Sequence, residues 1–281
     1  MLSHCKSFCI MTGNFVDIDR VRRHFSGSAA SYDRYAAVQK IVAGKLSAFL
    51  AGAGFPTGTV LEVGTGTGLL TERLMAAWPG VRPLVSDLAH DMTRLARRRL
   101  GELVAVDADC RALPFRSGSF AVVCSSSVYQ WVEDLPAAFT ESARVLTTGG
   151  CFAFALFGAG TLEELQESYR LEARKGGREA RYLHAFPEMG TVRNALEWAG
   201  FSGISLHQED LVEYHPEVAD LLRSLKGIGA GNASSLRPPG FASRKIMQGM
   251  MTRYRQRFAC EQGIPATYRV IYCLAKKKGD G

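Results

Sequence analysis

The stretch that decides the fold is Thr59-Val60-Leu61-Glu62-Val63-Gly64-Thr65-Gly66-Thr67-Gly68. Its first five residues favour a short buried strand, its glycines occupy alternate positions, and residues 69–77 favour a helix. Glycine lets the backbone turn tightly and lets a ligand approach without a side chain in the way. A strand, a glycine-rich turn and a helix in this order predict a nucleotide-type site at the start of an α/β domain.

The spacing of these glycines narrows the class of ligand. Gly64, Gly66 and Gly68 fall as G-x-G-x-G, whereas dinucleotide-binding loops follow G-x-G-x-x-G. An acidic residue, Glu62, also stands just before the first glycine. A carboxylate there suits a ligand that carries an amino group and a sulfonium, and it would repel a pyrophosphate.

Apolar strands and helices alternate along most of the chain. Strands are predicted at 59–63, 82–86, 103–106, 120–125, 151–157, 204–214 and 267–275, and helices at 18–25, 35–50, 69–77, 92–100, 136–146, 162–174, 189–199, 216–229 and 241–258. Continuous apolar strands separated by helices of this length are typical of a buried parallel sheet with helices on both faces. We therefore predict an α/β fold with a doubly wound, mostly parallel, seven-stranded sheet.

The same pattern divides the chain into regions. Residues 1–15 are interpreted as a leader, 16–58 as N-terminal helices that cover the site, 59–215 together with 263–281 as the α/β domain, and 216–262 as a basic helical lid inserted before the last strand.

Two aspartates follow consecutive predicted strands. Asp87 is placed to accept hydrogen bonds from both hydroxyls of a ribose, and Asp109 to accept from an adenine amino group. Met92 would pack against the adenine face. Aspartates at such positions also cap helices and form turns, but ligands of these sheets bind outside the carboxyl ends of the strands. Cys110 and Ser125 complete the predicted cofactor-binding set.

These residues resemble the motifs of the class I S-adenosylmethionine-dependent methyltransferases. The resemblance is carried by VLEVGTGTG at 60–68, SDLAHDM at 86–92, DADCRALPF at 107–115 and GGCFAF at 149–154. It implies a Rossmann-like enzyme whose cofactor is S-adenosylmethionine.

Three further strings are similar to the malonyl-acyl-carrier-protein O-methyltransferases, which open pimelate synthesis for biotin. They are SGSAASYDRYAAVQ at 26–39, SSSVYQWVEDL at 125–135 and LLRSLKGIGAGN at 221–232. This resemblance implies methyl transfer to the free carboxylate of a malonyl thioester on an acidic acyl carrier protein. A carboxylate is ionised at neutral pH, so no general base is required, and catalysis is mostly proximity and orientation.

The substrate side of the site is predicted from the same strings. We expect Tyr32 to line the methyl-transfer site, and Gln130 and Trp131 to stand where the substrate approaches. We expect Arg223 or Lys226, one helical turn apart, to hold the malonyl carboxylate. The alternatives are aromatic packing for Tyr32 and Trp131, and a plain surface charge for Lys226.

The charge of the chain is concentrated in the basic segment, residues 216–262. The net charge is +7 overall, and this segment alone holds eight basic and three acidic residues. Such a field attracts an acidic partner, although a solvated helix face is an equal alternative. Nucleic acid is a weaker interpretation, because no RGG, zinc-finger or RNP-type pattern is present.

The remaining features indicate a soluble cytoplasmic protein without a metal site. No apolar run reaches the ~20 residues that span a bilayer, and the seven cysteines are scattered, with only Cys5 and Cys9 close together. Two other functions stay open: a related methyltransferase of another small carboxylic acid or quinone precursor, and a nucleic-acid-binding methyltransferase.

Overall fold

The computed structural model describes residues 16–54, 58–101, 103–177, 184–230 and 244–279. The predicted leader at 1–15 and the loop at 231–243, within the predicted lid, lie outside the described residues. Across the described part of the chain, no helix is long and apolar enough to cross a membrane.

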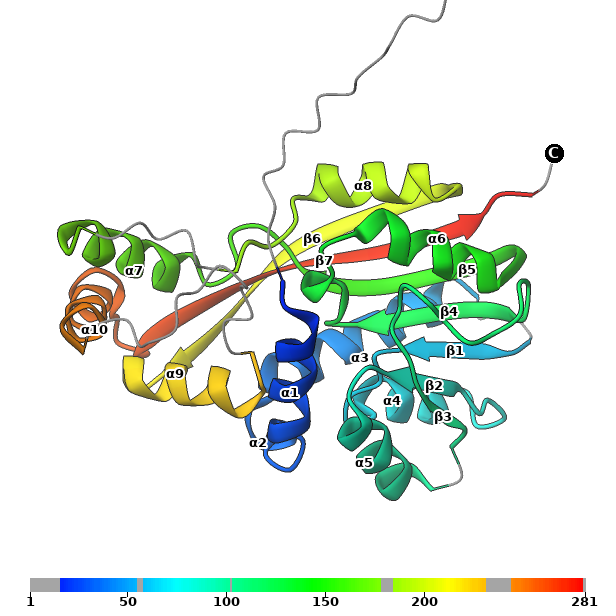
Figure 1. Cartoon of the computed structure of the whole chain (residues 1–281), viewed down its shortest axis with the longest axis horizontal. Coiled ribbons are helices and arrows are strands. Elements are labelled where there is room, and N and C mark those ends of the chain that lie inside the picture. Colours follow the sequence, from blue (N-terminus) through cyan, green and yellow to red (C-terminus); the bar gives the residue numbers. More distant parts are fainter. Residues whose placement is uncertain (1–15, 55–57, 102, 178–183, 231–243, 280–281) are drawn as a thin grey trace, which may run out of the picture.

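A seven-stranded sheet runs in the order β3-β2-β1-β4-β5-β7-β6 (Figure 1). Its strands are β1 Val60–Val63, β2 Leu84–Asp87, β3 Ala105–Asp107, β4 Phe120–Ser126, β5 Leu146–Phe157, β6 Phe201–His215 and β7 Ile264–Lys277. The pairs among β1 to β5 are parallel, and β7 is antiparallel to both of its neighbours. The predicted doubly wound, mostly parallel sheet is confirmed.

Helices cover both faces of the sheet. They are α1 Ile18–Ser28, α2 Tyr32–Tyr35, α3 Ala37–Gly52, α4 Leu69–Ala77, α5 His90–Leu100, the 3-10 turn η1 Tyr129–Trp131, α6 Leu135–Val145, α7 Glu163–Lys175, α8 Met189–Trp198, α9 Val218–Gly227 and α10 Arg244–Phe258. One helix was expected over 35–50. In the structure the helical conformation is interrupted at Ala36, which separates the short α2 from α3.

The core lies in two layers, one on each face of the sheet. One layer includes Leu46 of α3 and Leu74 of α4, and the other includes Phe139 of α6 and Leu196 of α8. Every residue of β1 is buried, because a central strand with helices on both faces has no side that meets water. This explains why β1 reads as a continuous apolar run interrupted only by Glu62.

The last two strands form a ribbon that extends beyond the rest of the sheet. The pairing of β5 with β7 ends at Val270, whereas β6 and β7 pair as far as Ile264. The far half of this ribbon lies among α7, α9 and α10 (Figure 1). The basic segment also adds Leu221 and Tyr254 to the core. The described part of the basic segment therefore packs into the core and is not a separate cover over the site.

Much of the charge of the basic segment is neutralised by neighbouring acids. On α10, Arg253 and Arg257 pair with Glu172 and Glu167 of α7, at 2.6 Å and 3.1 Å. The two glutamates lie outside residues 216–262, so a charge count along the sequence misses them. These two arginines are therefore paired within the protein, and the field left for a partner is smaller than the local count suggests.

Candidate functional site

A pocket opens at the carboxyl ends of β1, β2 and β4, beneath α1 and α2. It encloses about 880 Å³, its open mouth included. It is lined by Ile18, Val21, Phe25, Tyr32, Gln39, Glu62, Val63, Gly64, Thr65, Gly66, Thr67, Leu69, Leu70, Asp87, Leu88, Met92, Ala108, Asp109, Cys110, Ser126, Ser127, Val128, Trp131 and Val132. The fold thus brings together segments that lie about a hundred residues apart in the sequence.

The glycine loop forms the floor of this pocket. Gly64 has a φ of 70°, and a Cβ built on it would stand 2.2 Å from Cγ2 of Val128. Only glycine allows this close approach. Gly68 is different, because it does not line the pocket. It precedes α4 with a φ of 88°, where a Cβ would stand 2.6 Å from Leu100, so its place in the structure is helix packing.

Two enclosed carboxylates face the loop. Glu62 accepts a hydrogen bond from the Thr71 hydroxyl, and burial together with the nearby charge of Asp87 raises its pKa to about 8. Asp87 accepts from the backbone N–H groups of Gly66 and Ala89, both at 2.8 Å. It is accessible only in part, from the pocket side, and the surrounding protein raises its pKa to about 6. Two carboxylates that resist ionisation favour a ligand with positive charge.

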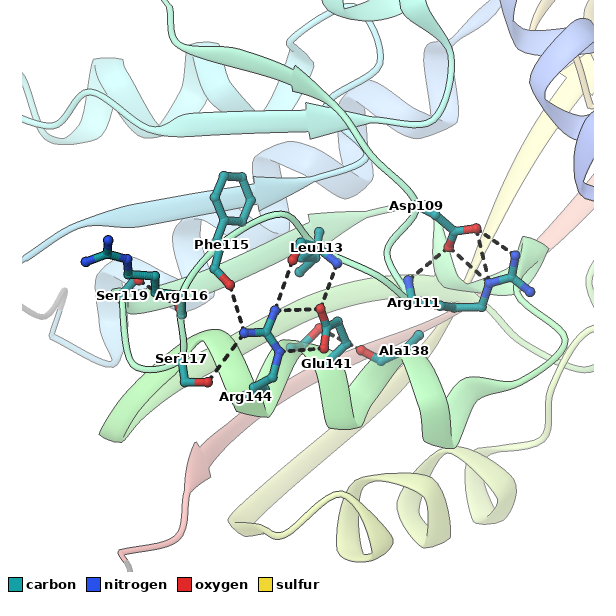
Figure 2. A network of polar contacts seen from close by, with 11 residues as sticks. Asp109, Arg111, Leu113, Phe115, Arg116, Ser117, Ser119, Ala138, Glu141 and Arg144 are labelled. Atoms are coloured by element: carbon teal, nitrogen blue, oxygen red, sulfur yellow. Dashed lines mark hydrogen bonds and ion pairs between the residues drawn. The ribbon is translucent and has the colours of Figure 1, made fainter.

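The Asp109 side chain is engaged at the rim. Its Oδ1 accepts from the Arg111 backbone N–H at 2.9 Å and its Oδ2 from Nη2 of Arg111 at 2.6 Å (Figure 2). The guanidinium holds the pKa of this carboxyl below its usual range. The turn-forming alternative weighed for Asp109 is thus observed, while the residue still lines the pocket. Its neighbour Cys110 is buried, with the thiol pKa raised to about 12 by burial and the Asp109 charge.

A second ion pair fixes the loop that carries Asp109. Arg144 of α6 donates to both carboxylate oxygens of Glu141, each at 2.7 Å. The same guanidinium donates to the carbonyl oxygens of Leu113 and Phe115, at 2.9 Å and 2.8 Å (Figure 2). Two of these four hydrogen bonds reach the loop directly, and the two to Glu141 fix the orientation of the planar guanidinium that makes them.

An aromatic wall closes the pocket beyond the glycine loop. Phe25 meets Trp131 edge to face with ring centroids 5.7 Å apart, and His184 lies 4.7 Å from Trp131 on another side. Nε2 of His184 lies 2.8 Å from the Gln130 carbonyl oxygen. Burial lowers the His184 pKa to about 4, so the ring is neutral. Sequence reasoning missed Phe25 and His184, and no local pattern marks either of them.

Tyr32 enters the pocket from α2, as predicted. Its ring lies 6.4 Å from that of Phe25. Burial and the charges of Asp87 and Asp33 raise the pKa of its phenol. The phenol therefore stays protonated and is a hydrogen-bond donor at physiological pH.

Two residues, Ser125 in β4 and Gln130 in η1, do not line the pocket as expected. The Ser125 hydroxyl donates to the Val63 carbonyl at 2.8 Å and is buried. The Gln130 amide donates to the Ser127 carbonyl at 2.8 Å. The serines that reach the pocket are Ser126 and Ser127, because the chain turns at Ser127, where φ is 59°.

Arg223 and Lys226 also lie outside the pocket lining. Helix α9 buries Leu221 and Ser224, so the positions two residues further along face solvent, and both basic side chains are exposed. Arg223 pairs with Asp220. The two cations do share a helix face, as predicted, but it is the solvent face. This corrects the expectation that they point into the cleft.

Comparison with known proteins places these features in context. A methyltransferase domain model matches residues 61–154. The chain is 46% identical to malonyl-acyl-carrier-protein O-methyltransferase of Geobacter sulfurreducens, over 93% of this chain and all of that one. It is 32% identical to the biotin biosynthesis bifunctional protein BioHC of Teredinibacter turnerae, over 93% of this chain and 47% of that one.

A solved structure shows the same fold. Phosphoethanolamine N-methyltransferase 2 of Haemonchus contortus, in complex with phosphomonomethylethanolamine and S-adenosylhomocysteine, superposes with a TM-score of 0.58. The match covers 94% of this chain and 61% of that one, at 16% sequence identity.

Proposed function

Because the chain belongs to the malonyl-acyl-carrier-protein O-methyltransferase family, we propose that it methylates the free carboxylate of a malonyl thioester on acyl carrier protein. S-adenosylmethionine is the methyl donor, and the product is the methyl ester that starts pimeloyl synthesis for biotin. The observation that carries this proposal is the pocket itself, in which Glu62 and Asp87 lie beneath Tyr32 and an apolar wall. The relatives reported above, malonyl-acyl-carrier-protein O-methyltransferase and a biotin biosynthesis protein, agree with it.

The residues of the pocket fit this cofactor. Its ammonium and sulfonium carry positive charge, which the raised pKa values of Glu62 and Asp87 favour. Asp87 ends β2, where its carboxylate can accept from ribose hydroxyls, and Met92 and Cys110 supply apolar surface for a base. S-adenosylmethionine supplies an electrophilic methyl group, so this chain need only place the acceptor oxygen in line with it.

The acceptor side requires no base. The substrate carboxylate is already ionised and takes the methyl group without losing a proton. Tyr32 remains protonated and donates a hydrogen bond that orients the acceptor oxygen. Phe25 and Trp131 exclude water. The charged residues in the described lining are all acidic, so the lining itself offers the acceptor neutral donors rather than a salt bridge.

The regions of the chain take matching roles in this proposal. Residues 16–58 cover the site, since Ile18, Phe25 and Tyr32 form part of the pocket wall. Helix α9 of the segment predicted as a lid lies beside this cover, with the exposed Lys226 available to the acidic carrier protein.

One assay tests the proposal. Purified protein is incubated with methyl-labelled S-adenosylmethionine and either malonyl-carrier protein or acetyl-carrier protein, which lacks the free carboxylate. We expect label only in the malonyl sample, released by mild base as from a methyl ester. Absence of transfer to the malonyl thioester by protein that binds the cofactor would show that the acceptor is a different acid.

A further inference from the structure

The LLRSLKGIGAGN string, singled out for its cations, makes its close contacts through its glycines. Gly227 is the last residue of α9, and a Cβ built on it would stand 2.2 Å from the ring of Tyr35. Two residues later, a Cβ on Gly229 would stand 3.0 Å from the backbone oxygen of His24. The end of α9 therefore lies against α1 and α2, the two elements that cover the pocket.

Hydrogen bonds join the same two surfaces. The Ser31 hydroxyl donates to the Gly227 carbonyl at 3.0 Å, and the Ser28 hydroxyl to the Lys226 carbonyl at 3.3 Å. Carbonyls at a helix C-terminus have no partner within the helix, so the cover caps α9. Each contact depends on how closely α9 approaches, and that approach depends on the missing side chain at position 227.

The opposite side of α2 is held by the cofactor loop. The Thr67 hydroxyl donates to Asp33 at 2.6 Å, and Arg99 of α5 donates to the other oxygen of Asp33 at 2.8 Å. Helix α2 has only four residues and cannot hold itself in place. Tyr32 is thus positioned between two attachments, Asp33 on the cofactor side and Tyr35 on the α9 side.

We propose that Gly227 is a positioning residue for Tyr32. By admitting the Tyr35 ring, it lets α9 dock on the cover, and this docking holds the Tyr32 phenol over the pocket. The conformation of α9, on the solvent side of the molecule, is thereby coupled to the site of methyl transfer. The activity measurement below rests on the proposed function, whereas the exchange measurement does not.

Gly227→Ala separates positioning from a simple effect on the helix. Alanine favours a helix more than glycine does, so a local effect alone would leave stability unchanged or raise it. The docking role predicts the opposite for the site: at least tenfold weaker binding of S-adenosylhomocysteine, a tenfold or larger loss of kcat on malonyl-carrier protein, and faster amide exchange at residues 16–36. Gly44→Ala in α3 is the matched control, because nothing lies within 4 Å of its added methyl group.

The double variant Gly227→Ala with Tyr35→Ala tests the route of the effect. The three atoms nearest to the added methyl group all belong to the Tyr35 ring, so without the ring the double variant should bind and exchange like Tyr35→Ala alone. Ser31→Ala, which removes the hydroxyl that donates to the Gly227 and Ser28 carbonyls, should move exchange at 16–36 in the same direction by less, and it serves if Gly227→Ala does not fold.

Two results would overturn the proposal. One is a Gly227→Ala protein with parental exchange at 16–36. The other is a loss of equal size in the Tyr35→Ala background. A parent enzyme that leaves malonyl-carrier protein unmethylated would count against the proposed function alone, because exchange at 16–36 reports on the docking in either case.

Discussion

At the scale of single residues, the site is defined by two acids, Glu62 and Asp87, whose pKa values the fold raises. Glu62 is 1% exposed and its hydroxyl donor, Thr71, is itself buried. A buried carboxylate without a cationic partner destabilises a fold unless a ligand or a proton neutralises it. The free-energy cost of burying the Glu62 carboxylate is consistent with a site that binds a positively charged ligand.

Asp87→Asn is expected to weaken cofactor binding at least tenfold. Hydrogen bonds to a charged acceptor contribute about 1.5–3 kcal/mol each, and a tenfold change in affinity corresponds to about 1.4 kcal/mol. Titration calorimetry with S-adenosylmethionine measures this. Asp91→Asn is the control, because Asp91 pairs with Arg94 on the surface of α5 and is not part of the lining. Equal affinities for the parent and Asp87→Asn would remove Asp87 from the site.

Cofactor affinity is expected to rise with pH up to about 8. The folded-state pKa of Glu62, about 8, is above its unfolded value, so the free folded protein holds a proton that the unfolded chain has already released. The contribution of Glu62 to the stability of the free protein is therefore fully present below its unfolded pKa and is lost as pH rises toward 8. A cationic ligand favours the ionised form, so binding releases this proton.

Calorimetry in two buffers of different ionisation enthalpy measures that release. Glu62→Gln has no proton to lose and should show a flatter pH profile. Parent affinity that stays constant between pH 6 and 8.5 would contradict the assignment.

At the scale of elements, a loop without regular structure is held by one helix. The chain from Asp109 to Ser119 carries part of the pocket rim, and Arg144 of α6 bonds to two of its carbonyls (Figure 2). The guanidinium fork therefore substitutes for the backbone pairing that a strand would provide.

Arg144→Ala should lower the free energy of unfolding by about 2 kcal/mol or more. The substitution removes the guanidinium donor from two backbone carbonyls and leaves the Glu141 carboxylate with the Leu113 N–H but without its ion-pair partner. Urea denaturation measures the loss, and cofactor affinity should fall by less than in Asp87→Asn. Arg116→Ala, an exposed residue of the same loop, should be nearly neutral. If the two variants unfold alike, the network contributes nothing beyond surface charge.

At the scale of the whole molecule, the charged residues of the described pocket lining are acidic, and much of the charge of the basic segment is paired with neighbouring acids. Arginines of α10 are paired with α7, whereas Lys226 is exposed beside the cover. An exposed cation of this kind acts on the encounter with a charged partner more than on chemistry within the pocket.

Lys226→Ala should slow methylation of malonyl-carrier protein at low ionic strength and leave a small malonyl thioester unaffected. The difference from the parent should shrink as salt is added. Arg255→Ala, which loses a pair with Glu217 on the same segment, controls for charge alone. A loss on the small thioester as large as on the carrier protein would mean that Lys226 reaches the acceptor after all.

The amino-acid sequence by itself determined the order of strands and helices, the glycine turn after β1, and the placement of Asp87 and Met92 at the pocket. These features are local: side-chain periodicity specifies each element, and parallel strands bring their carboxyl ends to one edge. Tyr32 and Trp131 were predicted at the pocket from the family resemblance, and no local pattern marks them.

Only the tertiary structure decided which side chains meet. In the structure, Asp109 accepts hydrogen bonds from Arg111, and His184 packs against Trp131. Ser126 and Ser127, rather than Ser125, line the pocket. The tertiary structure also turned Lys226 to solvent and placed Gly227 against Tyr35. The physical reason is that the buried face of each helix is selected by partners far away in the sequence, and no local pattern specifies those partners.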